Sequence, residues 1–407
     1  MSEIDHCSFC GRARDKVEML IQGVDGFICN ECVIRGVEIV KEELNESETF
    51  DPELLKHNKP ADIKRFLDQY VIDQEVAKRS MAVAVYNHYK RLSDPLGDEE
   101  GVEIEKSNII LIGPTGTGKT LMARTIAKML DVPFTIVDAT VLTEAGYVGE
   151  DVESILTRLL QSADYDVNLA EKGIVFIDEI DKIARKGDNP SITRDVSGEG
   201  VQQAILKLLE GSVVNVPPQG GRKHPEQRMI PVNTKNILFL VGGAFEGIER
   251  NIAKRLNTKV VGYGTQEKRD SIDKENMIQY VTAQDLRAYG LIPEIIGRLP
   301  VVTYLSSLSK DALRRILTEP KNALIKQYMH LFKIDGIEFT VEPKALDYIV
   351  DVSYDNKLGA RALRGICEII LTDAMFDLPS QAKKKFVLTE KLAKEKLAKI
   401  HVAQLKK

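Results

Sequence analysis

The sequence predicts an α/β protein built on a mostly parallel five-stranded sheet, with a smaller, mainly helical domain after it and a small four-cysteine module before it. Three observations predict this fold. Five short apolar runs alternate with helical stretches, a glycine-rich loop directly follows the first run, and two Cys-x-x-Cys pairs lie near the N-terminus. Apolar strands separated by helices are typical of a parallel sheet that is covered on both faces.

The cysteines predict the N-terminal module. Cys7 and Cys10 form one pair, Cys29 and Cys32 form the other, and 18 residues separate the pairs. This spacing is typical of a four-thiolate zinc site, in which the ion replaces the core that about 40 residues are too few to build. Redox dithiols or unligated thiols are the alternatives. Cys367 stands alone among apolar residues and is predicted to be a small buried hydrophobe.

The order of strands and helices predicts the domain organisation. Strands are expected at residues 108–112, 134–138, 173–177, 236–241 and 301–305. After Ser306 amphipathic helical segments dominate, at residues 312–317, 323–332, 343–350 and 360–375. An acidic stretch interrupted by Pro52 and Pro60 indicates a linker. The predicted domains are a zinc-binding domain (1–50), a linker (51–63), a large nucleotide-binding domain (64–305) and a small helical domain (306–407).

The glycine-rich loop has the sequence GPTGTGKT and lies between the first strand and a helical stretch, which is the context of a phosphate-binding loop. Its backbone N–H groups can surround phosphates, while Lys119 supplies a charge to the β- and γ-phosphates and Thr120 a hydroxyl to Mg²⁺. A chance glycine-rich turn is the alternative. The predicted nucleotide contacts here are Gly113, Pro114, Thr115, Gly116, Thr117, Gly118, Lys119, Thr120 and Leu121.

A second nucleotide signal, GIVFIDEID, places Asp178 and Glu179 at the end of the third strand. In ATPases with such a loop, an aspartate at this place helps to hold Mg²⁺ and a following carboxylate can orient the attacking water. We therefore expect Asp178 to hold the metal and Glu179 to serve hydrolysis. Arg298 and Arg361 are further candidates, because a guanidinium binds phosphate with two hydrogen bonds. The alternative for either arginine is a surface salt bridge.

Composition narrows the functional classes. The chain has 407 residues and a net charge of −5, which gives no general attraction to nucleic acid or membranes. No apolar run approaches the roughly 18 residues that span a bilayer, so a cytosolic protein is expected. A zinc-based, non-catalytic adaptor or nucleic-acid-binding protein is the alternative function. Six acidic against four basic side chains within residues 3–35 disfavour contact with nucleic acid.

Read together, these motifs closely resemble the ClpX-type unfoldases of the AAA+ family. The Cys₄ module, GPTGTGKT, GYVG, FIDEID, RDVSGEGVQQ, GGRKHP, GLIPEIIGRLP and GARALR occur in the family's order, from about Cys7 to at least Pro379. The resemblance implies a homohexameric ATPase that uses ATP, Mg²⁺ and Zn²⁺. It also implies that tagged or unfolded proteins, brought by adaptors, are unfolded and threaded into the ClpP peptidase, and that the zinc module dimerises.

The resemblance further implies residue roles. Arg298 matches the arginine finger that reaches the neighbouring subunit's nucleotide, and Arg361 matches the sensor-2 arginine. Val71 and Ile72 match the segment beside the adenine. HslU-type unfoldases and helicase-like motors are alternatives; the former carry a large inserted domain for which residues 182–213 leave no room, and the latter require a basic pore. The residues matching the substrate pore are Tyr147, Val148, Arg194, Arg222, Lys223 and His224.

Two departures from family patterns stand out. The tripeptide that docks ClpP is usually Ile-Gly-Phe, whereas this chain has Val261, Gly262 and Tyr263. The added phenol hydroxyl prefers water or a polar partner over an apolar cleft, so weaker docking is expected. After the fourth strand, Gly242 and Gly243 stand where the broader AAA+ pattern has a polar sensor-1 residue. ClpX-type chains share this run, so activity is still expected.

Overall fold

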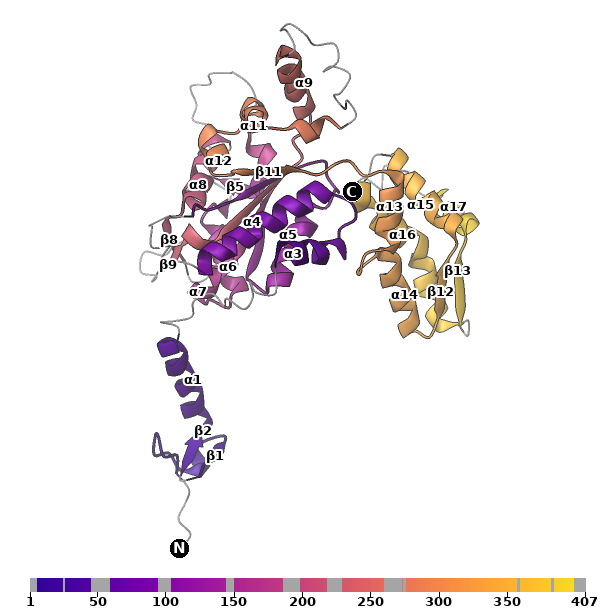
Figure 1. Ribbon diagram of the computed structural model, residues 1–407. Coiled ribbons are helices and arrows are strands. Elements are labelled where there is room, and N and C mark those ends of the chain that lie inside the picture. Colours follow the sequence, from indigo (N-terminus) through magenta and orange to yellow (C-terminus); the bar gives the residue numbers. More distant parts are fainter. Residues whose placement is uncertain are drawn as a thin grey trace. The chain divides into compact units, whose positions relative to one another are not determined.

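The computed structural model describes residues 6–24, 26–44, 59–93, 104–143, 150–185, 198–217, 229–259, 273, 276–356, 359–381 and 384–398 (Figure 1). The chain divides into two compact units, Met1–Glu53 and Leu54–Lys407, and each is described by itself. The finer domain boundaries given above stay predictions. Among the described residues, none of the helices combines the length and the apolar character that crossing a membrane requires.

The first unit is a hairpin followed by a helix. Strand β1 (Leu20–Gln22) pairs antiparallel with β2 (Phe27–Cys29), and helix α1 (Asn30–Leu44) starts directly after β2. Cys29 therefore ends a strand, and Cys32 lies in the first turn of a helix. Among the described residues of this unit, the buried hydrophobic side chains are Cys7 and Cys29. The described part of the unit therefore has no sizeable apolar core.

The second unit contains the predicted parallel sheet of five strands, which confirms the fold class. Their order is β11-β3-β10-β7-β4, and every pairing is parallel. The central strands are almost completely buried, which explains why they appear in the sequence as continuous apolar runs. The strands are β3 (Ile109–Ile112), β4 (Phe134–Asp138), β7 (Ile174–Asp178), β10 (Leu238–Gly243) and β11 (Val301–Tyr304).

Helices cover both faces of this sheet (Figure 1). On one face, Ile110, Val175 and Phe239 share a core with Ile155 and Ile205 of two helices. Side chains of the opposite face are buried as well. The helices are α3 (Pro60–Asp68), α4 (Glu75–Ser93), α5 (Lys119–Leu130), α6 (Ser154–Ser162), α7 (Val167–Ala170), α8 (Glu199–Glu210), α9 (Ile248–Lys259), α11 (Ala283–Tyr289) and α12 (Pro293–Gly297).

Two small strand pairs accompany the main sheet and were not predicted. Strand β5 (Leu142–Thr143) pairs parallel with β6 (Glu150–Asp151), and β8 (Val213–Val216) pairs antiparallel with β9 (Ile230–Asn233). The latter strands are partly exposed, so they lack the apolar run that marked the central strands.

The C-terminal part is mainly helical, as predicted, but it also holds a parallel pair of strands, β12 (Glu338–Val341) and β13 (Lys385–Leu388). It has its own core, which includes Leu313, Phe332 and Ile366. Cys367 is buried there, and burial raises the pKa of its thiol to about 12, as befits a small hydrophobe. The helices are α13 (Lys310–Thr318), α14 (Leu324–Ile334), α15 (Pro343–Asp355), α16 (Gly359–Asp377) and α17 (Glu390–Ala398).

Candidate nucleotide and metal sites

The candidate nucleotide site lies at the carboxyl ends of the central strands, where open parallel sheets place their ligands. Strand β3 runs into the glycine-rich loop, and α5 begins at Lys119. Gly116 and Gly118 have φ angles of 82° and 105°, a left-handed conformation that favours glycine. A Cβ atom on Gly118 would lie 3.9 Å from Val71 Cγ1, so the predicted adenine segment is next to this loop.

Lys119 is held inside the loop. Its Nζ donates to the carbonyl oxygens of Gly113 (2.6 Å) and Pro114 (3.1 Å). Burial lowers the pKa of its ammonium, although the nearby carboxylate of Asp178 acts in the opposite direction. The side chain therefore points into the curve of the loop, where a bound phosphate would be within its reach.

The two residues predicted to hold Mg²⁺ are in direct contact. Thr120 Oγ1 donates to Asp178 Oδ2 at 2.8 Å, although 57 residues lie between them. A hydroxyl and a carboxylate are the oxygen ligands with which such sites bind Mg²⁺ beside substrate phosphates. The donor set therefore fits the ion.

Glu179 follows the end of β7 and turns away from the line of the strand. Its φ angle is 57°, and its backbone N–H donates to Asp178 Oδ1 at 3.0 Å. Burial, and then the negative charges of Asp138 and Asp178, raise the pKa of the Glu179 carboxyl. A carboxylate with a raised pKa is a better acceptor for the proton of an attacking water. Sequence reasoning missed Asp138, which the parallel register of β4 and β7 brings opposite Asp178.

The glycines at the sensor-1 place are required by packing. A Cβ atom on Gly242 would lie 2.6 Å from Phe176 Cζ, and one on Gly243 would lie 2.8 Å from Asp181 Oδ1. Asp181 is buried and accepts a hydrogen bond from the backbone N–H of Ala244 at 3.0 Å. The backbone of this run is thus fixed by a carboxylate, and a polar side chain has no room at either glycine.

The two predicted arginines are in different surroundings. Arg298 is about half exposed and donates to Glu210 Oε1 at 3.2 Å. Arg361 is exposed in the first turn of α16, and its backbone N lies 3.5 Å from where a Cβ atom on Gly116 would be. The structure therefore places the start of α16 against the phosphate loop, whereas it pairs Arg298 with a surface carboxylate.

A cavity of about 200 Å³ lies where the start of α16 meets the large domain, with a mainly apolar lining. Val71 and Ile72 are buried and line a second cavity of about 250 Å³ together with Arg315. The sequence did not predict that residues of the helical part line the first cavity, because nothing in their local sequence links them to Leu121. The lining of the first cavity includes Tyr70, Leu121, Ile316, Leu317, Leu363 and Arg364.

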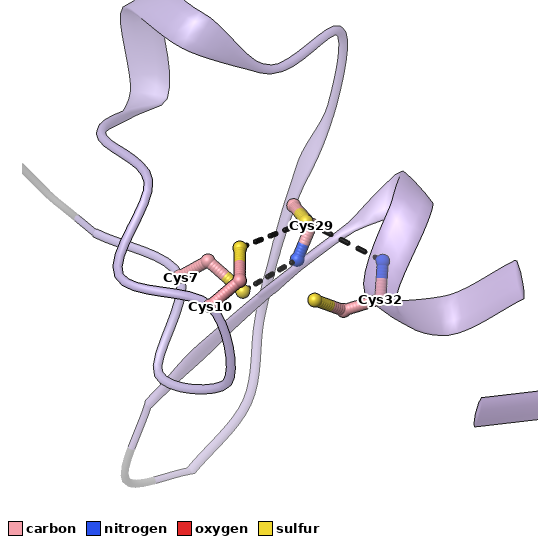
Figure 2. Close-up of side chains that lie close together, drawn as sticks. All are labelled: Cys7, Cys10, Cys29 and Cys32. Atoms are coloured by element: carbon pink, nitrogen blue, oxygen red, sulfur yellow. Dashed lines mark hydrogen bonds between the residues drawn. The ribbon is translucent and has the colours of Figure 1, made fainter. Parts of the chain in front are cut away.

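The four cysteines of the N-terminal unit converge (Figure 2). All four Sγ atoms lie within 4.8 Å of one another, and Cys10 Sγ is 3.7 Å from Cys29 Sγ. Zn–S bonds of about 2.3 Å in a tetrahedron put the sulfurs about 3.8 Å apart, so this pair matches zinc geometry. Backbone N–H groups also donate to sulfur, from Cys29 to Cys7 (3.3 Å) and from Cys32 to Cys29 (3.4 Å).

The electrostatics of this cluster favour a cation. Burial alone would raise the pKa of the Cys7 thiol, but backbone N–H donors lower it to about 6. The hydrogen bond to Cys10, together with burial, raises the pKa of Cys32 to about 12. Four adjacent thiolates repel one another, so a bound cation is needed to ionise all of them at neutral pH.

The remaining predicted site residues lie outside the described residues. These are the pore residues Tyr147, Val148, Arg194, Arg222, Lys223 and His224, and the docking residues Val261, Gly262 and Tyr263.

A phosphate loop on β3, two carboxylates at the end of β7 and a helical domain at the edge of the loop define the class as an AAA+ ATPase. Three family models match the chain. The model described as "AAA domain (Cdc48 subfamily)" matches residues 104–302, "ClpX C4-type zinc finger" matches 5–42, and "C-terminal, D2-small domain, of ClpB protein" matches 308–391.

Curated relatives narrow the class to one family. Proteins named "ATP-dependent Clp protease ATP-binding subunit ClpX" are 65% identical in Bacteroides thetaiotaomicron and 64% in Bacteroides fragilis, each over 98% of this chain and 97% of the relative. The Porphyromonas gingivalis protein of that name is 62% identical over 97% of this chain and 96% of its own. The chain belongs to the ClpX family. It is an ATPase that uses ATP and Mg²⁺ and binds Zn²⁺.

Proposed function

We propose that this protein is an ATP-driven unfoldase that works as a homohexameric ring. It recognises tagged proteins, unfolds them and threads them through its pore into the ClpP peptidase, and it acts as a chaperone without that peptidase. Family membership supports this proposal, and so does the relatives' name, which describes the ATP-binding subunit of a protease.

The observation that carries the ATP-driven part of the proposal is the contact between Thr120 and Asp178 beside the buried Lys119. Mg²⁺, when bound, neutralises phosphate charge at this place, and we assign Thr120 and Asp178 as its ligands. Lys119 and backbone N–H groups within the loop from Gly113 to Leu121 bind the phosphates; Pro114 has no N–H to contribute. Glu179 orients the attacking water and accepts its proton.

The arginines complete the site, Arg298 from the neighbouring subunit and Arg361 from the helical domain of the same chain. Arg298 is half exposed at the surface, where a neighbouring subunit can offer its nucleotide, and we assign it as the finger that stabilises charge in the transition state. Arg361 lies in the first turn of α16 beside the loop and links the nucleotide to the helical domain. Val71 and Ile72 are assigned as apolar contacts of the adenine.

The remaining assignments follow the motif matches in the sequence. Tyr147 and Val148 are assigned to grip the translocating polypeptide, because an aromatic side chain can contact any chain without reading its sequence. Arg194, Arg222, Lys223 and His224 line the pore and attract acidic tags. Val261, Gly262 and Tyr263 dock the peptidase.

The zinc module, residues 1–50, is assigned to dimerisation and to the binding of substrates and adaptors, on a linker at residues 51–63. Its acidic balance fits protein partners better than nucleic acid. We place the protein in the bacterial cytosol, where the thiols stay reduced and available to zinc.

The test uses a tagged fluorescent protein with Mg²⁺ and ATP. Wild type is expected to abolish its fluorescence, and Glu179→Gln to bind ATP but leave the substrate folded. Adding ClpP then distinguishes unfolding from peptidase docking. With ClpP, the Tyr263→Phe variant should support degradation of the tagged substrate at least as fast as wild type does. Wild type that hydrolyses ATP without unfolding the substrate would exclude the unfoldase assignment.

A further inference from the structure

The side chain of Gln74 clasps the connection between the sheet and the helical domain. Its Oε1 accepts from the backbone N–H of Ser306, and its Nε2 donates to the backbone carbonyl of the same residue, both at 2.9 Å. Ser306 lies between β11 and α13, and Gln74 is buried. One amide thus satisfies both backbone groups of one residue at the joint.

Two other contacts tie the same segment, residues 69–74, to the helical domain. The backbone N–H of Lys321 donates to the carbonyl of Gln69 at 2.7 Å, and Arg315 Nη1 lies 2.8 Å from Asp73 Oδ1. The ion pair is about two-fifths exposed, so it contributes little. Gln74 is itself buried and makes two hydrogen bonds to one residue, so it is the stronger side-chain link.

The backbone of the segment is strained in a way that directs Gln74. Asp73 and Gln74 have φ angles of 54° and 60°, two consecutive non-glycine residues in the left-handed region. Such conformations persist where the surroundings over-determine them, and they cluster at functional sites. This turn directly follows Val71 and Ile72 and brings the Gln74 amide onto Ser306.

We infer that Gln74 is a positioning residue that fixes the distance between the sheet-domain wall and the helical-domain wall of the nucleotide pocket. The cavity beside the phosphate loop takes Tyr70 and Leu121 from the sheet domain and Leu317 and Leu363 from the helical domain. Their separation depends on the joint at Ser306, which the clasp fixes to residues 69–74. The inference rests on the nucleotide site assigned under the proposed function.

Thr234 provides a matched control. Its buried Oγ1 accepts from the backbone N–H of Ser212 at 3.0 Å and donates to the carbonyl of the same residue at 3.2 Å. The bonding pattern equals that of Gln74, but both residues lie within the sheet domain. Gln74→Met and Thr234→Val each remove two part-buried hydrogen bonds while approximately keeping side-chain volume.

The experiment measures binding of a fluorescent, slowly hydrolysed ATP analogue with Mg²⁺, and the melting temperature, on the full chain. Both variants should lower the melting temperature. Gln74→Met should weaken nucleotide binding about tenfold, and Thr234→Val should stay within about twofold of wild type. If Gln74→Met fails to fold, Gln74→Glu keeps the acceptor for the N–H of Ser306 but sets a second oxygen against its carbonyl, and it should weaken nucleotide binding by a similar factor.

Lys119→Ala distinguishes the two levels of failure. If it binds the analogue as wild type does, the assigned nucleotide site is wrong. If it loses binding while Gln74→Met binds like Thr234→Val, the site stands and the positioning role of Gln74 is wrong.

Discussion

The nucleotide site has two halves that differ in how completely one chain builds them. At the strand ends, Lys119, Thr120 and Asp178 are bonded to one another or to their own loop. The half that contains the arginines is more open. Arg298 is half exposed and pairs with Glu210 at the surface, and Arg361 is exposed at the start of α16. One half is formed within the sheet domain alone, whereas in the proposed ring Arg298 acts on the neighbouring subunit's nucleotide and Arg361 belongs to the helical domain.

This difference indicates a division of labour. Groups that bind nucleotide in any state are best pre-organised, because they then pay no ordering cost on binding. In the proposed ring, groups that signal assembly are best left incomplete, so that hydrolysis depends on ring formation.

Arg298→Ala should lower kcat about 10³-fold, because an arginine finger supplies at least that factor, while KM for ATP stays near the wild-type value. Steady-state ATPase assays measure both constants. Arg287→Ala, which removes another exposed arginine of the same region, should be near wild type.

The trans assignment of Arg298 can be tested by mixing subunits. Arg298→Ala has an intact loop, and Glu179→Gln has an intact arginine, so mixed rings should regain part of the ATPase activity that each variant lacks alone. Mixtures no more active than the sum of their components would show that Arg298 acts within its own subunit.

Thr120→Val should lower kcat about 10²-fold, because it removes the hydroxyl that contacts Asp178 at the assigned Mg²⁺ site. The control is Thr125→Val on the same helix, where the hydroxyl only donates to the carbonyl of Leu121 at 2.7 Å. In a titration of ATPase activity with Mg²⁺, Thr120→Val alone should need a higher Mg²⁺ concentration for half-maximal activity. Equal behaviour of both variants would contradict the assignment.

The rate should fall on acidification at a pH above that expected for an ordinary glutamate, because burial and the charges of Asp138 and Asp178 raise the pKa of Glu179. Only the ionised form accepts a proton, so the rate drops about tenfold per pH unit below that pKa. Asp138→Asn keeps the acceptor for the backbone N–H of Thr140 and should shift the fall in rate to lower pH. If the fall in rate stays at the same pH, another group titrates.

Glu210→Gln should have the smallest effect. It removes the charge that faces Arg298 but keeps an acceptor oxygen, and exposed ion pairs contribute about 0–1 kcal/mol to the free energy of unfolding. ATPase activity should stay within about twofold of wild type. A tenfold rise would show that Glu210 restrains the finger.

The sequence predicted the central sheet well because β3, β7 and β10 are buried on both faces and appear as apolar runs. It missed β12 and β13, which are partly exposed and pair across more than 40 residues of intervening chain. Short strands of mixed burial give no periodic signal, and their partner is set by tertiary packing.

The candidate site shows the same limit. The motifs located Lys119, Thr120 and Asp178, and the structure brings these residues together. Asp138 and Gln74 were not found as functional residues, because their roles depend on strand register and on a contact across 232 positions. Local patterns reveal groups whose chemistry is written in one segment, and they do not reveal groups that act through a distant partner.

The hydrogen bonds of Lys119 have a consequence for ligand choice. Two loop carbonyls already accept hydrogen bonds from its ammonium. A lone phosphate that binds Lys119 must replace the hydrogen bonds to Gly113 and Pro114, so its net gain from this contact is small. A chain of phosphates gains the same contact and the loop N–H groups in addition. The loop therefore discriminates by the length of the polyanion, and inorganic phosphate released after hydrolysis is a poor competitor for the next ATP.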